Sequence, residues 1–301
     1  MASHRYQIPD MRGPHPLGRH VNHDERSFDF PFAARPEAAA TVKTVSWQRR
    51  VPIFDQGQLG SCTGNAAAGW VGADDSLRSG LVTVDGAGVN EDLAVALHGE
   101  ATQIDPYKGT YPPTDTGSDG LSVAKALKAR SLIDSYTHGF STTDLVTALQ
   151  STPVLIGIPW YDNMFNPDKD GFVYIGGAVA GGHEVCVVGY DDEGKFIVFA
   201  NSWSTSWGVD GYGKMSLSTL TQLLSQDGDV TVPHALVVAP APPSPPSPPA
   251  PVPPTPTPPA PPTPTPPKPD PPVDVLNWIE EHIEDLGELI VGWFRKHWPR
   301  G

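Results

Sequence analysis

A proline-rich stretch, residues 239–272, limits how much of this 301-residue chain can fold into a globular domain. Nearly every second residue or more in it is proline, with Ala, Ser and Thr between. Because proline has a fixed φ and no backbone N–H, the stretch predicts a polyproline II spacer rather than a helix or a sheet strand. At ~3.1 Å per residue, the spacer would reach on the order of 100 Å when fully extended. We therefore expect a globular domain before it and a separate short element after it.

The chain before the spacer divides into an arm and a domain. Residues 1–45 are polar and rich in His, Arg and Pro, which predicts an extended arm. Residues 46–238 have the composition of a mixed globular domain. Helical patterns occur at residues 63–72, 92–98, 121–129 and 143–150, and strand patterns at residues 154–158, 185–190, 196–199, 213–217 and 235–238. Helices early and strands late predict an α+β fold with a cleft between two unlike halves.

Residues 273–301 follow the spacer and carry the pattern of an amphipathic helix. Its apolar residues at steps of three and four are Leu276, Ile279, Ile283, Leu286, Ile290 and Trp293. An isolated helix cannot bury such a stripe, so we expect the segment to bind a partner protein or to self-associate. Its Trp and Phe residues leave a membrane interface open as an alternative, and folding back onto the domain is a third.

Charge and cysteine content exclude several classes of protein. The formal net charge of −14 argues against nucleic acid or an anionic membrane surface as the main partner. Two cysteines far apart do not make a disulfide framework. The N-terminus lacks the apolar core of a secretory signal and no apolar run is long enough to span a bilayer, so we expect a chain made as a soluble cytoplasmic protein. The arm contains His4, His15, His20 and His23 without the spacing of a metal site; a flexible polar arm is favoured, and no metal or cofactor is expected.

The stretch VPIFDQGQLGSCTGNAAAGW, residues 51–70, contains a candidate nucleophile. Cys62 follows Ser61 and precedes small, helix-compatible residues, which places it at the first turn of a helix, where the dipole favours the thiolate. Gln56 lies six residues earlier beside a glycine, where its carboxamide could donate to an oxyanion next to the Cys62 amide. Taken alone, a cysteine before an Ala-rich helix is more often a core residue.

His183 and Asn201 supply the other groups that a thiol hydrolase needs. His183 lies in AGGHEVCVVGY, at the mouth of an apolar strand pattern, and Asn201 ends the next strand pattern. Antiparallel pairing across the DDEGK turn would bring the two side chains together. A neutral amide can accept a hydrogen bond from one ring nitrogen and leave the other facing the sulfur.

Three motifs, DQGQLGSCTGNA, GGHEVCVVGYDD and NSWSTSWGVDGYG, resemble in order and spacing the papain-like cysteine peptidases, and look closest to a bacterial branch with a short N-terminal extension. The resemblance covers about residues 45–220. It implies a two-lobed fold, with a helical lobe that carries the cysteine and a β-barrel-like lobe that carries the histidine and asparagine. It also implies that Cys62 is the nucleophile, His183 the acid and base, Asn201 the orienting group and Gln56 the oxyanion donor.

The resemblance implies supporting roles for further residues. Trp203 would shield the histidine–asparagine hydrogen bond from water, and Trp207 would line one side of the cleft. Gly120, in TDTGSDGLSVAKAL, is predicted to contact the substrate backbone, and Gly182 is expected to support the adjacent histidine. The chain departs from the family pattern at Thr63, where an aromatic residue usually follows the nucleophile. In place of the long propeptide of classical members, the resemblance implies that the arm of residues 1–45 is a short propeptide that either crosses the cleft or braces the domain.

Two residues near His183 carry separate interpretations. Cys186 falls three positions later on a strand, so its side chain should point to the opposite face, and a buried apolar role is favoured over that of a second nucleophile. Glu184 is either a solvated strand-edge charge or a group that tunes the subsite beyond His183.

The sequence therefore predicts hydrolysis of peptide bonds in protein or peptide substrates by Cys-His-Asn thiol chemistry, with the C-terminal helix as a tether to a larger bacterial or phage assembly. Two alternatives remain open. One is an amide hydrolase that acts on peptidoglycan. The other is a catalytically silent binding or scaffold protein whose work is done by the C-terminal helix.

Overall fold

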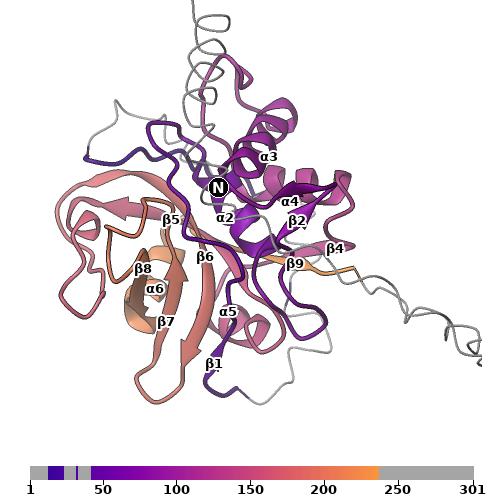
Figure 1. Ribbon diagram of the computed structural model, residues 1–301. Coiled ribbons are helices and arrows are strands. Elements are labelled where there is room, and N and C mark those ends of the chain that lie inside the picture. The colour runs from indigo at the N-terminus through magenta and orange to yellow at the C-terminus, as the bar shows by residue number, and fades with distance from the viewer. Residues whose placement is uncertain (1–12, 24–31, 33–41, 237–301) are drawn as a thin grey trace, which may run out of the picture. The chain divides into compact units, whose positions relative to one another are not determined.

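The structure is a computed structural model that describes residues 13–23, 32 and 42–236 (Figure 1). Contacts divide the chain into two units, residues 1–241 and 242–301, and the described residues all belong to the first. The predicted proline-rich spacer and C-terminal helix lie outside the described residues.

Helices form one half of the described domain. They are α2 (Cys62–Val71), α3 (Glu91–Ile104) and α4 (Gly120–Ala129), with α2 lying between the other two helices and the long strand β6 (Figure 1). The predicted helices at residues 63–72, 92–98 and 121–129 are thus confirmed, although α3 extends a further six residues beyond its predicted end.

Local capping and small residues explain how these helices begin and pack. The Asn90 side chain accepts hydrogen bonds from two backbone N–H groups at the start of α3, and the Asp119 side chain accepts one at the start of α4. Every residue of α2 is buried. A Cβ on Gly64 would overlap the Ala94 carbonyl oxygen, so glycine is what allows α2 and α3 to approach closely.

The second half is an antiparallel sheet in the order β4-β9-β5-β6-β7-β8, with β1 also paired to β6. Its strands are β1 (Val45–Ser46), β4 (Ser135–Gly139), β5 (Val154–Tyr161), β6 (Val179–Asp191), β7 (Phe196–Ala200), β8 (Tyr212–Ser216) and β9 (Asp229–His234). The remaining elements are the short hairpin of β2 (Thr83–Val84) and β3 (Ala87–Gly88), the helices α5 (Thr142–Ala148) and α6 (Leu217–Leu224), and the 3-10 helix η3 (Asp162–Phe165). The helices and this sheet together confirm the predicted α+β class.

Two separate cores correspond to the two halves. One core lies among the sheet, α5 and α6, and the other between the opposite side of the central strands and helices α2, α3 and α4. Alternate residues of β6 serve both: Val185 and Val187 belong to the first core, and Cys186 and Val188 to the second. The predicted buried position of Cys186, on the face opposite its neighbours, is confirmed.

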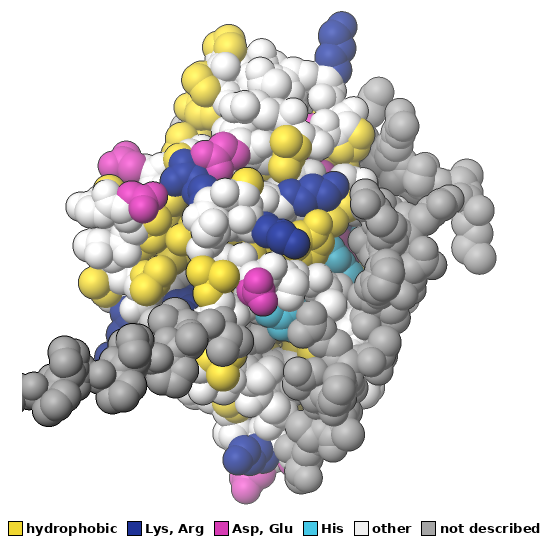
Figure 2. Space-filling view, turned by 90° about the vertical axis from the view of Figure 1, so that its right-hand side faces the viewer, with side chains coloured by type: hydrophobic (Ala, Val, Ile, Leu, Met, Phe, Trp, Pro, Cys, Tyr) yellow, Lys and Arg dark blue, Asp and Glu magenta, His cyan; other side chains and the backbone are white. Residues whose placement is uncertain are grey.

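Two features of the surface bear on possible partners. On the face shown in Figure 2, acidic and basic side chains are interspersed rather than gathered by sign. Among the described residues, none of the helices combines the length and apolar character needed to cross a membrane.

The strand predicted at residues 235–238 is wrong for residues 235 and 236, since the last strand of the described residues, β9, occupies Asp229–His234; residues 237 and 238 lie outside the described residues. Helix α6 and strand β4 were also not predicted. β9 contains Asp229 and Pro233, which are poor strand formers, and it is held by pairing with β4 and β5. Non-local pairing therefore overrides the local pattern at this place.

Gly64→Ala should destabilise the domain, because the added methyl group would force α2 away from α3. We expect the free energy of unfolding to fall by about 1–3 kcal/mol, measured by chemical denaturation of the full chain. The matched control is Gly88→Ala, whose Cβ would meet no atom closer than 4.0 Å, and it should change stability by less than about 0.5 kcal/mol. Equal stability of the two variants would contradict the close helix approach.

Candidate active site

Cys62 is the first residue of α2 and is completely buried. The preceding turn is held by Asn65, whose side-chain amide donates to the backbone carbonyl of Ser61 at 2.9 Å and to its hydroxyl at 3.0 Å. The sulfur thus stands at the N-terminal end of a fixed helix, where the helix dipole stabilises negative charge.

His183 lies on β6 and Asn201 directly follows β7, and pairing of these strands brings the two side chains together. His183 Nε2 lies 2.8 Å from Asn201 Oδ1. The same oxygen also accepts a hydrogen bond from the Ser202 backbone N–H at 2.8 Å, which fixes the orientation of the amide. Because Oδ1 can only accept, Nε2 carries the proton, and the neutral ring keeps a lone pair on Nδ1. Nδ1 has no hydrogen-bond partner among the described residues.

Aromatic side chains enclose this histidine. Trp203 stacks on the His183 ring, with ring centroids 4.5 Å apart, and Trp160 meets it edge-on at 4.9 Å. Trp207 packs against both tryptophans and donates from Nε1 to the Phe165 carbonyl, so it lies in the core behind them. Trp203 therefore occupies the shielding position expected for it, whereas Trp207, only 5% exposed, supports Trp203 rather than presenting an open surface.

Gln56 is held next to the cysteine loop by residues far away in sequence. Its Oε1 accepts a hydrogen bond from the Ser202 hydroxyl at 2.6 Å, and its backbone N–H donates to the Ser202 carbonyl at 2.9 Å. The other end of the amide, Nε2, donates to the carbonyl of Leu59 at 2.8 Å and approaches that of Pro16 at 3.4 Å. The amide can thus donate to a peptide carbonyl of a chain lying over Cys62, as an oxyanion donor must.

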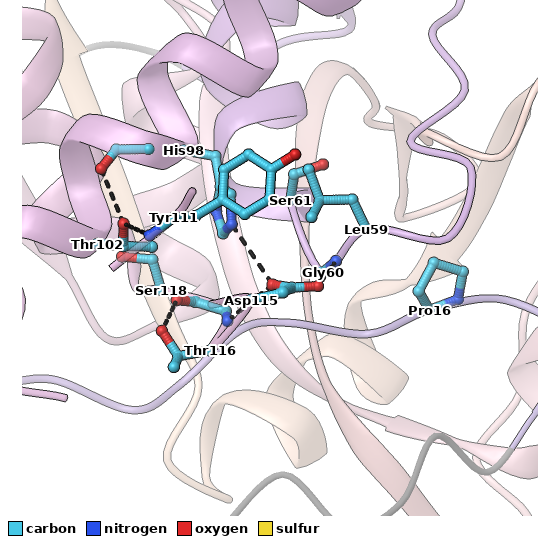
Figure 3. Close-up of polar contacts among 12 residues, drawn as sticks. Pro16, Leu59, Gly60, Ser61, His98, Thr102, Tyr111, Asp115, Thr116 and Ser118 are labelled. Carbon is cyan, nitrogen blue, oxygen red and sulfur yellow. Dashed lines mark hydrogen bonds and ion pairs between the residues drawn. The ribbon is translucent and has the colours of Figure 1, made fainter. Parts of the chain in front are cut away.

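A partly exposed carboxylate, that of Asp115, braces the loop that carries the cysteine. Figure 3 shows Asp115 between the His98 side chain and the backbone near Gly60. Asp115 accepts from the Gly60 N–H at 2.7 Å and from the Gly117 N–H at 3.2 Å, and it lies 3.5 Å from His98 Nε2. The loop before Cys62 is thereby tied to helix α3 and to the loop before α4. No local pattern in the sequence indicates this brace, because its three parts are distant in the chain.

The described part of the N-terminal segment lies along these residues. The Ser118 N–H donates to the carbonyl of Gly18 at 2.8 Å, and the His20 N–H donates to the carbonyl of Ser118 at 2.7 Å. On the other side, the Arg19 N–H donates to the Gly182 carbonyl at 2.9 Å. Residues 18–20 therefore bridge the helical half and the sheet.

Side chains of the segment also make specific contacts. His15 stacks on Trp203 with ring centroids 4.6 Å apart, and His20 stacks on Tyr107 at 4.0 Å. The interpretation of these histidines as part of a flexible polar arm is wrong for residues 13–23. Hydrophobic periodicity carries no information about a segment held by backbone pairing, so the sequence did not reveal these contacts.

The two supporting glycines lie on separate elements, Gly120 at the start of α4 and Gly182 on β6. The residue that pairs with the extended segment is Ser118, and Gly120 instead begins α4 with its Cα facing the Glu184 and Asp229 carboxylates. Gly182 contacts the segment itself, since a Cβ there would overlap the Arg19 carbonyl. Glu184 is completely buried, so its interpretation as a solvated charge is wrong.

Burial beneath the segment changes the pKa values of Cys62 and His183. Burial, with a smaller contribution from the Glu184 carboxylate, raises the pKa of the Cys62 thiol to about 12. Burial lowers the pKa of His183 to about 4, against the opposing effect of its hydrogen bond to Asn201. With the segment in place, the pair is a neutral thiol and a neutral imidazole at pH 7.

Among the described residues, no group of three or more His, Cys, Asp or Glu side chains is arranged to hold a metal ion. The residues brought together at this site are a thiol, an imidazole and two carboxamides. This set matches nucleophilic acyl transfer in its chemistry.

The pKa of His183 predicts a stability loss on acidification. Between about pH 6.5 and 4 the unfolded chain binds a proton at this position and the folded chain does not, so the free energy of unfolding falls as the pH falls through that window. The slope contributed by this one group approaches about 1.4 kcal/mol per pH unit. A His183→Gln variant should show a shallower slope between pH 6.5 and 4 in urea denaturation, and identical slopes in variant and parent would contradict the buried neutral imidazole.

The known proteins to which this chain is similar are cysteine peptidases of one kind. A sequence model of the papain family of cysteine proteases matches residues 91–226, a range that includes His183 and Asn201 and begins after Cys62. The chain is 24% identical over 216 residues to an uncharacterized peptidase C1-like protein of Acanthamoeba polyphaga mimivirus, covering 58% of this chain and 67% of the viral protein. It is 27% identical over 206 residues to digestive cysteine proteinase 1 of Homarus americanus, covering 60% and 63% of the two chains. The matches thus span about two thirds of the length of these curated relatives.

The fold has a counterpart among solved structures. The crystal structure of xylellain, a cysteine protease from Xylella fastidiosa, superposes with a TM-score of 0.58 at 17% identity, covering 76% of this chain and 99% of xylellain. At this identity the likeness concerns the fold alone. The family match and the relatives make the chain similar to the papain-like cysteine peptidases, and the likeness to xylellain shows the fold.

Proposed function

We propose that the chain hydrolyses peptide bonds with Cys62 as the nucleophile and His183 as the acid and base. The observation that carries this proposal is the His183 Nε2 to Asn201 Oδ1 contact of 2.8 Å, because it leaves Nδ1 of the same ring available for proton exchange with the thiol. The position of Cys62 at the start of α2 supports the same assignment.

In the proposed reaction, the thiol first transfers its proton to His183 Nδ1 once a substrate or solvent has replaced the N-terminal segment. The thiolate attacks the peptide carbonyl carbon, and Gln56 Nε2 with the Cys62 backbone N–H stabilises the oxyanion. The imidazolium then protonates the leaving amine, which yields a thioester. Water, deprotonated by the same imidazole, attacks the thioester and releases the acid and the free thiol.

We also propose that residues 1–45 act as a short propeptide. The backbone pairing of residues 18–20 with both halves and the complete burial of Cys62 support this, since a nucleophile that no solvent reaches meets a substrate only when the segment is displaced. Displacement of the segment would restore solvent to Cys62 and His183 and so shift their pKa values toward the ion pair.

Cys62→Ala in the full chain should abolish hydrolysis of casein. We expect the rate to fall by at least about 10³-fold, since the nucleophile and its base act as a unit. The matched control is Cys186→Ala, which removes the other buried thiol, on the face opposite His183, and it should stay within about two-fold of the parent. Casein hydrolysis by Cys62→Ala at the parental rate would refute the assignment. Purified peptidoglycan digested in parallel separates a peptidase from a lytic amide hydrolase.

The tether is a proposal from the sequence alone. We propose that residues 273–301 form an amphipathic helix that self-associates or binds a partner protein at the end of the proline-rich spacer, because its apolar stripe has no partner within itself.

Truncation after residue 272 should therefore change the oligomeric state. In analytical ultracentrifugation at micromolar concentration, we expect the full chain to sediment as a larger species than the truncated chain, with equal casein hydrolysis per domain. If the full chain sediments as a monomer in the absence of vesicles, as the truncated chain does, self-association is excluded. Co-sedimentation of the full chain alone with such vesicles would instead favour a membrane interface.

A further inference from the structure

A buried acidic pocket lies beside His183, formed by Glu184 of β6, Gly157 of β5 and Asp229 of β9. We propose that this pocket recognises an arginine side chain of the peptide substrate, and that Arg19 of the N-terminal segment occupies it in this structure. The inference rests on the proposed peptidase function and names the substrate class of the same site.

Strand register builds the pocket. Gly157 pairs with Glu184 on one side and with Asp229 on the other, so the three residues form a row across three adjacent strands and share one face of the sheet. The glycine in the middle has no side chain, and a Cβ there would overlap the guanidinium of Arg19. The space over Gly157, between the carboxylates of Glu184 and Asp229, thus leaves room for one planar cation.

Arg19 fills this gap almost without exposure, with only 2% of its side chain accessible. Its NH2 group makes an ion pair with Asp229 Oδ2 and donates to the Asp227 carbonyl at 2.9 Å. Neither oxygen of Glu184 has a hydrogen-bond partner among the described residues. Burial and the neighbouring Asp229 carboxylate raise the pKa of Glu184, and the Arg19 guanidinium opposes that rise. The acceptor capacity of Glu184 is available to a cation seated slightly differently.

The pocket requires a cation because it concentrates buried acids. Glu184, Asp229 and Asp119 are all buried, at most 3% exposed, and they act on one another electrostatically. Around them lie the Asn22 amide, which donates to Asp119, the His23 ring, 3.1 Å from Asp229, and His138 of β4, whose interaction with Asp229 lowers the pKa of that carboxyl. Without a cation, like charges in a low-dielectric site repel and one of them takes up a proton. Arginine keeps its charge when buried, which makes it the fitting occupant.

The geometry of the pocket favours arginine over lysine. Acceptors lie on separate strands and on the loop before β9, namely the Asp229 carboxylate, the Asp227 carbonyl and the Glu184 carboxylate. A planar fork with five N–H groups can reach several of these at once, whereas an ammonium is a single point charge.

The pocket adjoins the reacting groups. Gly18, next to Arg19, packs on the carbonyl of Gly60, which lies two residues before Cys62. A backbone hydrogen bond with Gly18 acts to lower the pKa of the Cys62 thiol, against the larger effect of burial. The Arg19 backbone N–H donates to the carbonyl of Gly182, the residue before His183. A substrate that replaces the segment along the same backbone positions places one of its own side chains in the pocket.

The first test measures binding without turnover. In the full chain, Arg19→Ala empties the pocket, and agmatine, a small guanidinium compound, should then raise Tm by about 2–4 °C at saturating concentration. Agmatine should leave the Tm of the parent unchanged, because Arg19 already occupies the pocket. Glu184→Gln combined with Arg19→Ala should lose most of the shift, whereas Glu100→Gln combined with Arg19→Ala, which removes an acid paired with Arg130 outside the pocket, should keep it. If Arg19→Ala fails to fold, Arg19→Lys takes its place in the test, because lysine retains the charge but binds the pocket more weakly than arginine.

The second test measures specificity. Internally quenched peptides of Ala and Gly carry one arginine at successive positions, and each has a partner with citrulline, which has the same shape and no charge. With Arg19→Ala we expect kcat/KM to favour arginine over citrulline by about 10- to 100-fold at one position, mainly through KM. Adding Glu184→Gln should reduce this ratio to less than about three-fold, and adding Glu100→Gln should not. Because the ratio compares two peptides on one enzyme, an effect of Glu184 on the Cys62 thiol cancels.

The outcomes separate the two proposals. Hydrolysis of the peptides with no preference for arginine, or a preference that survives Glu184→Gln, overturns the pocket assignment and leaves the peptidase standing. No hydrolysis of any peptide, together with an agmatine shift that depends on Glu184, overturns the peptidase and keeps a guanidinium site. No agmatine shift in Arg19→Ala overturns the pocket regardless of turnover.

Discussion

The alternation of side chains along β6 is the constraint on which the site depends. Because successive residues of a strand point to opposite faces, His183 and Glu184 are neighbours in sequence that serve different surroundings. His183 lies on the side of the tryptophans, and Glu184 shares a face with Cys186 and the helical half. A shift of β6 by one residue against β5 or β7 would exchange these faces, so the pairing that builds the sheet also decides which of the two side chains lies against the tryptophans and Asn201.

The sequence predicted the parts of the site that are marked by local pattern. Cys62 at a helix start, and His183 and Asn201 on two strands joined by a short turn, follow from periodicity and turn composition, and the contact between His183 and Asn201 was foreseen from that turn. The helix boundaries near Cys62 were within one residue. These features depend on interactions within about twenty residues, which propensity and pattern can indicate.

The parts that were missed depend on contacts between distant segments. Arg19 and Asp229 are 210 positions apart, and no local pattern marks either of them. Asp115 acts through Gly60 and His98, and Ser202 acts through Gln56, again across different elements. One signal was present: a glycine inside the apolar run VLIGIPW, at Gly157, is typical of a place where another group approaches the backbone closely. The approaching group is the guanidinium of Arg19.

The acidic pocket is a costly arrangement for stability alone. Buried ion pairs often contribute less than well-packed apolar residues of similar volume, and the cost rises when the charges outnumber their partners. Here one guanidinium faces the carboxylates of Glu184 and Asp229, and the two oxygens of Glu184 have no hydrogen-bond partner among the described residues. An apolar side chain at position 184 would pack against Gly120 of α4 without this desolvation cost. The carboxylate therefore has its clearest physical rationale in selecting which side chain enters the gap at Gly157, and a segment that supplies its own arginine there competes with the substrate through the same charge.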